Sequence, residues 1–127
     1  ELAAEPISSR TLDGIRDFWK VPLECVSHSY GFAEACAYVS TTSSQFFNGI
    51  AAAGDITHSA QNGKNIIIAD PVTKRALPDE QTGDIFVQGV GIANGYWNNP
   101  EASKVFENEI EGYQGKWLDF INKVPER

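Results

Sequence analysis

The segment from Gly83 to Trp97 constrains the fold of this chain more than any other stretch, because it changes from a strand pattern into a glycine-rich bend. Ile85 and Val87 alternate with neighbours that we expect to be more exposed, which is the period of a β-strand. Glycines then punctuate the segment until it ends on two aromatic side chains. The segment therefore predicts a strand that leaves its sheet through a tight, irregular turn.

This bend does not match a dinucleotide-binding loop. Gly89 and Gly91 occupy the first two glycine positions of G-x-G-x-x-G, but Asn94 stands at the third and Gly95 comes one residue late. A periodic helix does not follow directly, so the helix N-terminus that would receive a pyrophosphate is missing from the pattern.

Three ordered segments resemble motifs of the adenylate-forming enzymes, which include acyl-CoA synthetases, fatty acyl-AMP ligases, luciferases and the adenylation domains of peptide synthetases. The bend resembles their G-E-[IL]-x-[IV]-x-G…G-Y-W block, Tyr30–Ala35 resembles Y-G-x-[TA]-E, and Ala3–Ile7 resembles G-A-E-P-I. Ala33, in place of the usual Thr, is typical of the fatty acyl-AMP ligase branch. The resemblance runs from Ala3 to about Leu118 and covers a middle slice of the family's enzyme.

The resemblance implies an α/β (α+β) fold class, as a fragment of the adenylate-forming fold. We expect residues 1–48 to form part of an α/β sheet layer that carries the first two motifs. Residues 49–118 then form a β-barrel-like, β-rich subdomain with the glycine-rich segment and a helix after it. Residues 119–127 form a tail that diverges from the family pattern.

The resemblance also implies a nucleotide site. Glu34 takes the place of the family's catalytic, Mg²⁺-binding glutamate, and Tyr30 takes the place of the ring that faces the adenine. Gly31 would let the backbone approach the ligand closely, and Ala4 and Glu5 correspond to the segment that lines the purine. Taken from the residues alone, Glu34 is an acid in an otherwise apolar stretch, and a surface glutamate is the favoured interpretation, which the match of three motifs reverses. Tyr30 alone is more commonly a core tyrosine.

The function implied is one step of fatty acid metabolism. The parent protein would be a ligase that activates a fatty acid with ATP and Mg²⁺ to an acyl-adenylate, in lipid biosynthesis, and passes the acyl group to an acyl carrier protein or to CoA. We expect this chain alone to be inactive. The alternative is a non-catalytic remnant that serves as a nucleotide-binding (AMP-binding) or protein-interaction module.

Composition excludes several other classes. The net charge of −7 argues against nucleic acid as a partner. We find no apolar run long enough for a transmembrane segment and no signal peptide, so we expect a cytoplasmic protein. Cys25 and Cys36 are too few for a disulfide framework, and Cys25-x-x-His28 has no second paired spacing for zinc. We expect both thiols to be buried and inert.

Local patterns predict the elements. A helix should run from a Ser8 or Ser9 cap to Lys20, and strands should cover Leu23–Ser29, Asn65–Ala69 and the start of the bend. We expect 40–48 to be a mobile loop, and 99–112 to hold a helix that starts at the Asn99 cap and has an apolar face reaching Ile110. Trp97 is expected to pack under Pro100 or Phe106.

Overall fold

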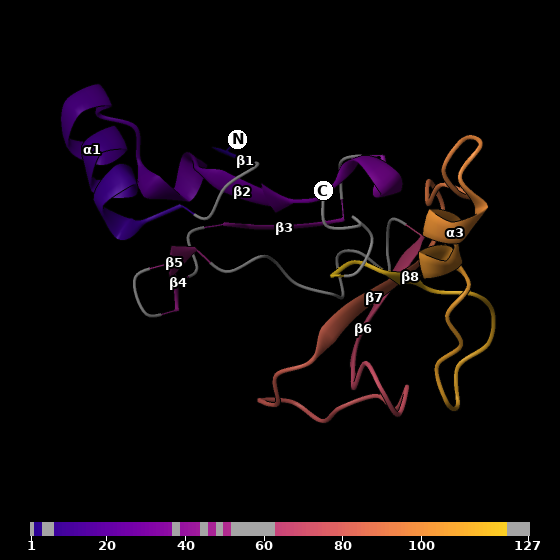
Figure 1. Ribbon diagram of the computed structural model, residues 1–127. Coiled ribbons are helices and arrows are strands. Elements are labelled where there is room, and N and C mark those ends of the chain that lie inside the picture. The colour runs from indigo at the N-terminus through magenta and orange to yellow at the C-terminus, as the bar shows by residue number, and fades with distance from the viewer. Residues whose placement is uncertain are drawn as a thin grey trace. The chain divides into compact units, whose positions relative to one another are not determined.

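The structure is a computed structural model, and it describes residues 2–3, 7–36, 39–43, 46–47, 50–51 and 63–121. The chain divides into two compact units, Glu1–Gln61 and Asn62–Arg127, each with its own sheets. Figure 1 labels their helices and strands. The subdomain boundary expected at residues 48–49 stays a prediction, because residues 44–45, 48–49 and 52–62 lie outside the described residues.

The first unit contains the helix that the sequence predicted. Helix α1 spans Ser9–Trp19, and the hydroxyl of Ser8 accepts a hydrogen bond from the Thr11 N–H at its start. Lys20 ends the helix in a left-handed conformation at φ 56°. Leu12 is the helix residue that is buried, whereas Phe18 and Trp19 are exposed.

A three-stranded sheet in the order β1-β2-β3 organises the rest of this unit. Strand β1 (Leu2–Ala3) runs parallel to β2 (Ser27–Tyr30), and β2 pairs antiparallel with β3 (Ser40–Ser43). Strands β4 (Phe46–Phe47) and β5 (Ile50–Ala51) form a separate antiparallel pair.

Two sequence expectations about this unit were wrong. Residues 40–43 form strand β3 rather than a loop, because backbone hydrogen bonds to β2 satisfy this polar, Thr-containing segment. The strand expected over Leu23–Ser29 starts only at Ser27. A short 3₁₀ helix, η1 (Leu23–Cys25), precedes it, and the Cys25 N–H bonds to the Pro22 carbonyl.

The core of the first unit joins α1 to the chain that follows it. Ile7, Leu12 and Val26 are buried together, and partly buried Ile15, Val21 and Leu23 pack against them. The segments before and after α1 therefore both pack against the helix, and these apolar contacts fix the position of the chain that leads into β2.

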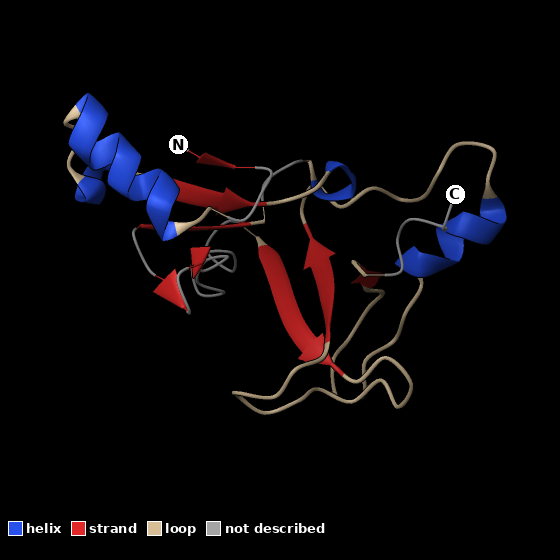
Figure 2. Cartoon of the chain, turned by 60° about the vertical axis from the view of Figure 1, so that its left-hand side comes forward, coloured by secondary structure: helices blue, strands red, loops and turns tan. Residues whose placement is uncertain are grey.

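The second unit is built on a long β-hairpin, which Figure 2 shows as two paired red strands. Strand β6 (Lys64–Ala69) pairs antiparallel with β7 (Asp84–Gly89), and the short β8 (Leu118–Asp119) pairs with the other edge of β7. Both predicted strands are confirmed. Gly89 lies at φ 125°, where a Cβ would approach the Gly63 carbonyl oxygen to 2.1 Å, so this position requires glycine.

One face of this sheet carries the core of the second unit. The core consists of Ala69, Phe86, Ile110 and Trp117, with Ile67 packed against it. The register opposes Ile67 to Phe86, and side chains alternate across a strand. Side chains of β6 and β7 on this face therefore pack against Ile110 and Trp117, which come later in the chain.

The helix that follows the bend starts where expected but ends early. The Asn99 side chain accepts a hydrogen bond from the Ala102 N–H, which caps α3 (Pro100–Ser103), and a 3₁₀ turn, η3 (Lys104–Phe106), completes it. The helix does not reach Ile110, because the backbone of Asn108 forms a β-bridge with Trp117 instead.

The expected position of Trp97 was also wrong. Its side chain is 98% exposed. Tyr96 makes the aromatic contact with Phe106, at 5.4 Å between ring centroids.

Candidate functional site

The candidate site is built at the end of strand β2. Four consecutive pairs join β2 to β3, from Ser27 opposite Ser43 to Tyr30 opposite Ser40. The Val39 N–H donates to the Tyr30 carbonyl at 2.9 Å, so the chain that leaves the sheet after Tyr30 is joined to it again at Val39. Tyr30 through Cys36 therefore form a short excursion whose two ends are fixed by backbone hydrogen bonds.

Tyr30 lies half-buried at the start of this excursion. Its ring meets Phe32 edge-on, with centroids 6.4 Å apart and planes at 72°. Burial raises the pKa of Tyr30 to about 12, because the ionised phenolate is disfavoured away from water. Near neutral pH the side chain is an uncharged, flat ring, as an ordinary tyrosine with a pKa near 10 also is, and such a ring can stack on a base.

Glu34 lies on the same excursion, in the middle of the 3₁₀ helix η2 (Ala33–Ala35). Ala35 is fully buried and anchors this turn, whereas Glu34 is half-buried and Gly31 is exposed. Cys36 closes η2 in the left-handed region at φ 53°. Only three residues lie between Tyr30 and Glu34 along this part of the chain.

The residues present are compatible with Mg²⁺, although they do not make a complete metal cage. Among the described ranges, no three His, Cys, Asp or Glu side chains gather closely enough to hold a metal ion. Mg²⁺ keeps several waters and is commonly bound through one or two carboxylates together with substrate phosphates. A single carboxylate at Glu34 fits that mode, while the described residues offer nothing that resembles a closed zinc site.

The other two predicted site residues, Ala4 and Glu5, lie outside the described residues. Ala3 pairs with Ser29 in the parallel ladder of β1 and β2, so the chain just before them runs beside the strand that leads to Tyr30. This pairing places Ala3, the first residue of the first motif, beside β2, whose last residue Tyr30 begins the second motif. The convergence of Ala4 and Glu5 with Tyr30 and Glu34 stays a prediction.

Two further features of this region could not be predicted from the motifs. Strand β3 contributes the Thr41 hydroxyl, which donates to the His28 carbonyl at 3.1 Å and supports the last part of β2. The cysteines were expected to be buried, but Cys25 and Cys36 are both exposed free thiols. Each lies at or just beyond the end of a 3₁₀ turn, where the local apolar pattern gives no guide to burial.

The raised pKa of Tyr30 predicts how this unit responds to alkali. The unfolded tyrosine ionises near pH 10 and the folded one near pH 12. Between these values the unfolded state has released the proton that the folded state retains, so stability is highest below about pH 10 and falls as the pH rises towards 12. Absorbance at 295 nm, compared with Tyr30→Phe, should place the Tyr30 midpoint near 12. A midpoint near 10 with unchanged circular dichroism would contradict the burial.

Comparison with known proteins identifies the class of this fold. The AMP-binding enzyme family matches residues 2–97, which include β1, β2, η2 and the glycine-rich bend. This chain belongs to the AMP-binding enzyme family, and the resemblance drawn from its three motifs is confirmed.

Individual relatives extend this picture. A long-chain-fatty-acid–AMP ligase from Mycolicibacterium smegmatis is 30% identical over 134 residues, covering 85% of this chain and 21% of that protein. A fatty acyl-adenylate ligase from L. pneumophila, solved in complex with acyl adenylate and pyrophosphate, superposes with a TM-score of 0.75 at 23% identity, over 92% of this chain and 25% of that one.

A third protein shares the fold. McyG A-PCP, solved in complex with phenylalanyl-adenylate, superposes with a TM-score of 0.70 at 20% identity, over 93% of this chain and 21% of that chain. The chain thus spans about a fifth to a quarter of each of these three proteins. The predicted fold class, a fragment of the adenylate-forming α/β fold, is confirmed.

The sequence predicts no transmembrane segment, and the helices in the described part of the chain can be compared with this prediction. None of the helices there is both long and apolar enough to cross a bilayer.

Proposed function

We propose that this chain is part of an ATP-dependent ligase that activates a fatty acid as its acyl-adenylate. The observation that carries the proposal is the fixed excursion at the end of β2, which presents an uncharged tyrosine ring and a half-buried glutamate close together along the chain. This excursion lies within the span that matches the AMP-binding enzyme family.

The proposed reaction needs positioning and charge neutralisation more than a protein nucleophile. A carboxylate oxygen of the fatty acid bonds to the α-phosphorus of ATP, the bond from that phosphorus to the bridging oxygen breaks, and pyrophosphate leaves. Tyr30 would stack on the adenine, Gly31 would admit the nucleotide close to the backbone, and Ala4 and Glu5 would line the purine. Glu34 would hold Mg²⁺, which neutralises phosphate charge when it is bound.

The proposed acceptor is a thiol, on an acyl carrier protein or on CoA. The fatty acid substrate is supported by the activities for which the M. smegmatis and L. pneumophila proteins are named. The carrier protein is supported by McyG A-PCP, whose structure joins an adenylate-bound protein to a carrier. We further propose that the parent ligase works in the cytoplasm, in lipid biosynthesis.

A second candidate is a non-catalytic module that binds a nucleotide or a protein. The observation that favours it is coverage: residues 1–127 correspond to about a fifth of the M. smegmatis ligase, so most contacts to a transition state would come from elsewhere. We therefore propose that this chain alone does not form acyl-adenylate.

Pyrophosphate release tests this proposal. A protein that contains residues 1–127 and is as long as the relatives should release pyrophosphate from ATP only when a fatty acid is present. The 127-residue chain alone should release no pyrophosphate above a heat-killed control. Acid-dependent release by the short chain would contradict the partial-enzyme proposal. Lack of release by the longer protein with every medium-chain and long-chain acid tested would favour the non-catalytic module.

A further inference from the structure

The second unit contains a hollow of about 440 Å³ that the proposed adenylation chemistry does not use. It is lined by Lys74 and by side chains of the segment 109–116. Lys74 ends the turn that follows β6, and the segment 109–116 connects η3 to β8. All of its walls belong to the Asn62–Arg127 unit.

Backbone hydrogen bonds fix the two sides of this hollow to each other. Lys74 adopts a left-handed conformation at φ 56°, and its N–H donates to the Asp70 carbonyl at 3.0 Å. The Lys74 carbonyl accepts from the Glu111 N–H at 2.9 Å. Because these contacts involve the main chain, the position of Lys74 beside the segment 109–116 does not depend on a flexible ion pair.

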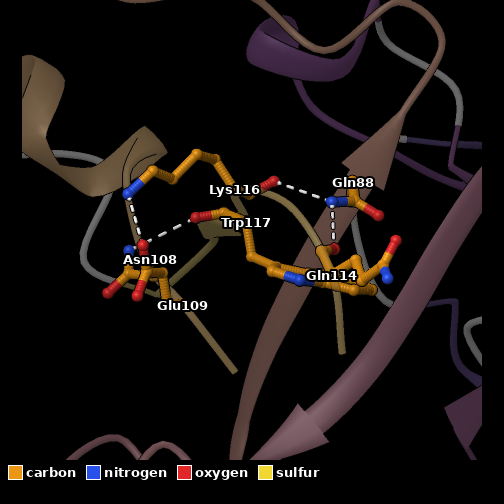
Figure 3. Close-up of polar contacts among 6 residues, drawn as sticks. All are labelled: Gln88, Asn108, Glu109, Gln114, Lys116 and Trp117. Carbon is orange, nitrogen blue, oxygen red and sulfur yellow. Dashed lines mark hydrogen bonds and ion pairs between the residues drawn. The ribbon is translucent and has the colours of Figure 1, made fainter. Parts of the chain in front are cut away.

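The Gln88 side chain holds the far side of the segment, as Figure 3 shows. Its amide donates to the Gln114 carbonyl at 2.9 Å and to the Lys116 carbonyl at 3.2 Å. Gly115 lies between these two carbonyls at φ 86°, and a Cβ there would come within 2.2 Å of the Gln88 amide nitrogen. Glycine at position 115 therefore leaves room for the two hydrogen bonds from Gln88 that hold this wall of the hollow.

Three of the four charged side chains that line the hollow are in ion pairs. Glu109 pairs with Lys116 at 2.8 Å, a contact drawn in Figure 3, and Glu111 pairs with Arg75. Within the part of the chain that the structure describes, Lys74 forms no ion pair.

The carboxylate of Asp70 lies near Lys74 and keeps its negative charge. It accepts hydrogen bonds from the Thr73 and Val72 N–H groups at 2.7 and 2.9 Å, and these hydrogen bonds, with a smaller contribution from the charge of Lys74, lower the pKa of Asp70. The two glutamates that line the hollow each pair with another residue, whereas Lys74 has no ion pair in the described structure.

The uncharged part of the wall is aromatic and aliphatic. The Lys74 ammonium lies 4.8 Å from the centroid of the Phe86 ring, and Ile110 is 3% exposed at the base. Tyr113 is 50% exposed and meets Trp117 edge-on at 6.2 Å. Behind Tyr113, the indole nitrogen of Trp117 is buried and has no hydrogen-bond partner in the described structure. An indole N–H is a donor only, so a buried one without an acceptor calls for an explanation.

We propose that this hollow binds a small aromatic carboxylate. Its carboxylate pairs with Lys74, and its ring packs on Tyr113 and Ile110. A monoanion with an apolar body fits better than phosphate, because a single cation between two glutamates cannot neutralise a dianion. This site is independent of the proposed function, since none of its residues takes part in the excursion after β2.

The indole N–H signals of the complete chain provide the test. The chain has three tryptophans, and Trp19 and Trp97 are exposed whereas Trp117 is 2% exposed. In ¹H–¹⁵N spectra assigned with Trp19→Phe and Trp97→Phe, sodium benzoate should shift the Trp117 signal in a saturable way with a Kd of about 1 mM. The other two indole signals should stay in place.

Two variants and two further probes separate this site from general salt effects. Lys74→Gln should weaken benzoate binding about 3- to 5-fold, as expected for loss of an exposed ion pair. Lys104→Gln removes an exposed lysine that pairs with Glu101 on α3, and it should leave the Kd unchanged. Benzyl alcohol, which has the ring without the charge, and inorganic phosphate, which has charge without the ring, should each bind more weakly than benzoate.

Four results would overturn the proposal. They are a lack of saturable Trp117 shift up to ~20 mM benzoate, equal shifts of all three indole signals, phosphate binding as tight as benzoate binding, and equal Kd values for Lys74→Gln and Lys104→Gln. A single collapsed position for the three indole signals before benzoate is added would also overturn it, because Trp117 would then not be packed behind Tyr113.

Discussion

Replacing Glu34 with glutamine in the parent ligase is expected to lower acid-dependent pyrophosphate release by about 100-fold or more, the range found when one preorganised electrostatic contact is removed. Glutamine keeps the shape of the side chain but removes the negative charge that a hard cation such as Mg²⁺ requires. The short turn η2 should tolerate the exchange, because Glu34 is half-buried while the neighbouring Ala35 supplies the buried anchor.

The matched control is Glu24→Gln. Glu24 is exposed in η1, on the other side of β2 along the chain, and belongs to no motif. Its replacement should leave the rate within about twofold, the effect of a surface exchange. Rates measured across a Mg²⁺ series distinguish metal binding from folding, since Glu34→Gln should recover part of its activity at high Mg²⁺. Equal rates for Glu34→Gln and the parent at limiting Mg²⁺ would show that Glu34 is not a metal ligand.

The largest stability effect is expected from Phe86→Ala in the core of the second unit. Phe86 is fully buried between Ala69, Ile110 and Trp117, and the Lys74 ammonium lies over its ring. Truncating a buried phenylalanine removes apolar contacts and leaves a cavity, which lowers the free energy of unfolding by about 3–5 kcal/mol. Because small domains are stable by only about 5–15 kcal/mol, this loss removes much of the stability of the unit.

Urea unfolding followed by tryptophan fluorescence measures this effect. In a background of Trp19→Phe and Trp97→Phe, the signal comes from Trp117, which packs in the same core. Phe18→Ala is the control, because Phe18 is 82% exposed and its loss should change the free energy of unfolding by less than about 0.5 kcal/mol. Similar midpoints for Phe86→Ala and Phe18→Ala would mean that the described core does not form.

The features that could be predicted from sequence are those set by local hydrogen bonds or by strand periodicity. The side chains of Ser8 and Asn99 each accept a hydrogen bond from the backbone three residues later, so these residues indicate in the sequence where the helices start. The β6 and β7 strands likewise follow from β-branched and alternating apolar residues that need a sheet face.

The features that were missed depend on partners far away in sequence. Strand β3 forms because its polar backbone pairs with β2, and the helix after Asn99 stops because Asn108 pairs with Trp117. The exposed Trp97 shows the same dependence, since Tyr96 rather than Trp97 contacts Phe106. Tertiary contacts decide which segments pair in this way, and the propensities of single residues do not report these contacts.

The candidate site divides in the same way. Tyr30 and Glu34 could be selected because an ordered set of motifs identified the family, while the residues alone favour a surface glutamate and a core tyrosine. The structure adds the return of the chain to the Tyr30 carbonyl through Val39 and the partial burial of the Tyr30 ring. The hollow beside Lys74 had no motif, because its residues come from two segments that meet only in the fold.

The most direct test of the central proposal follows the oxygen atoms of the fatty acid. If the parent ligase joins a carboxylate oxygen to the α-phosphorus, a fatty acid labelled with ¹⁸O in its carboxylate should give AMP that carries one ¹⁸O after the acyl group passes to a thiol. Mass spectrometry of the AMP should show this label with the parent and with Glu24→Gln, and a strongly reduced amount of labelled AMP with Glu34→Gln. Unlabelled AMP as the product, or labelled AMP in equal amounts from Glu34→Gln and the parent, would contradict the proposed reaction and the role of Glu34 respectively.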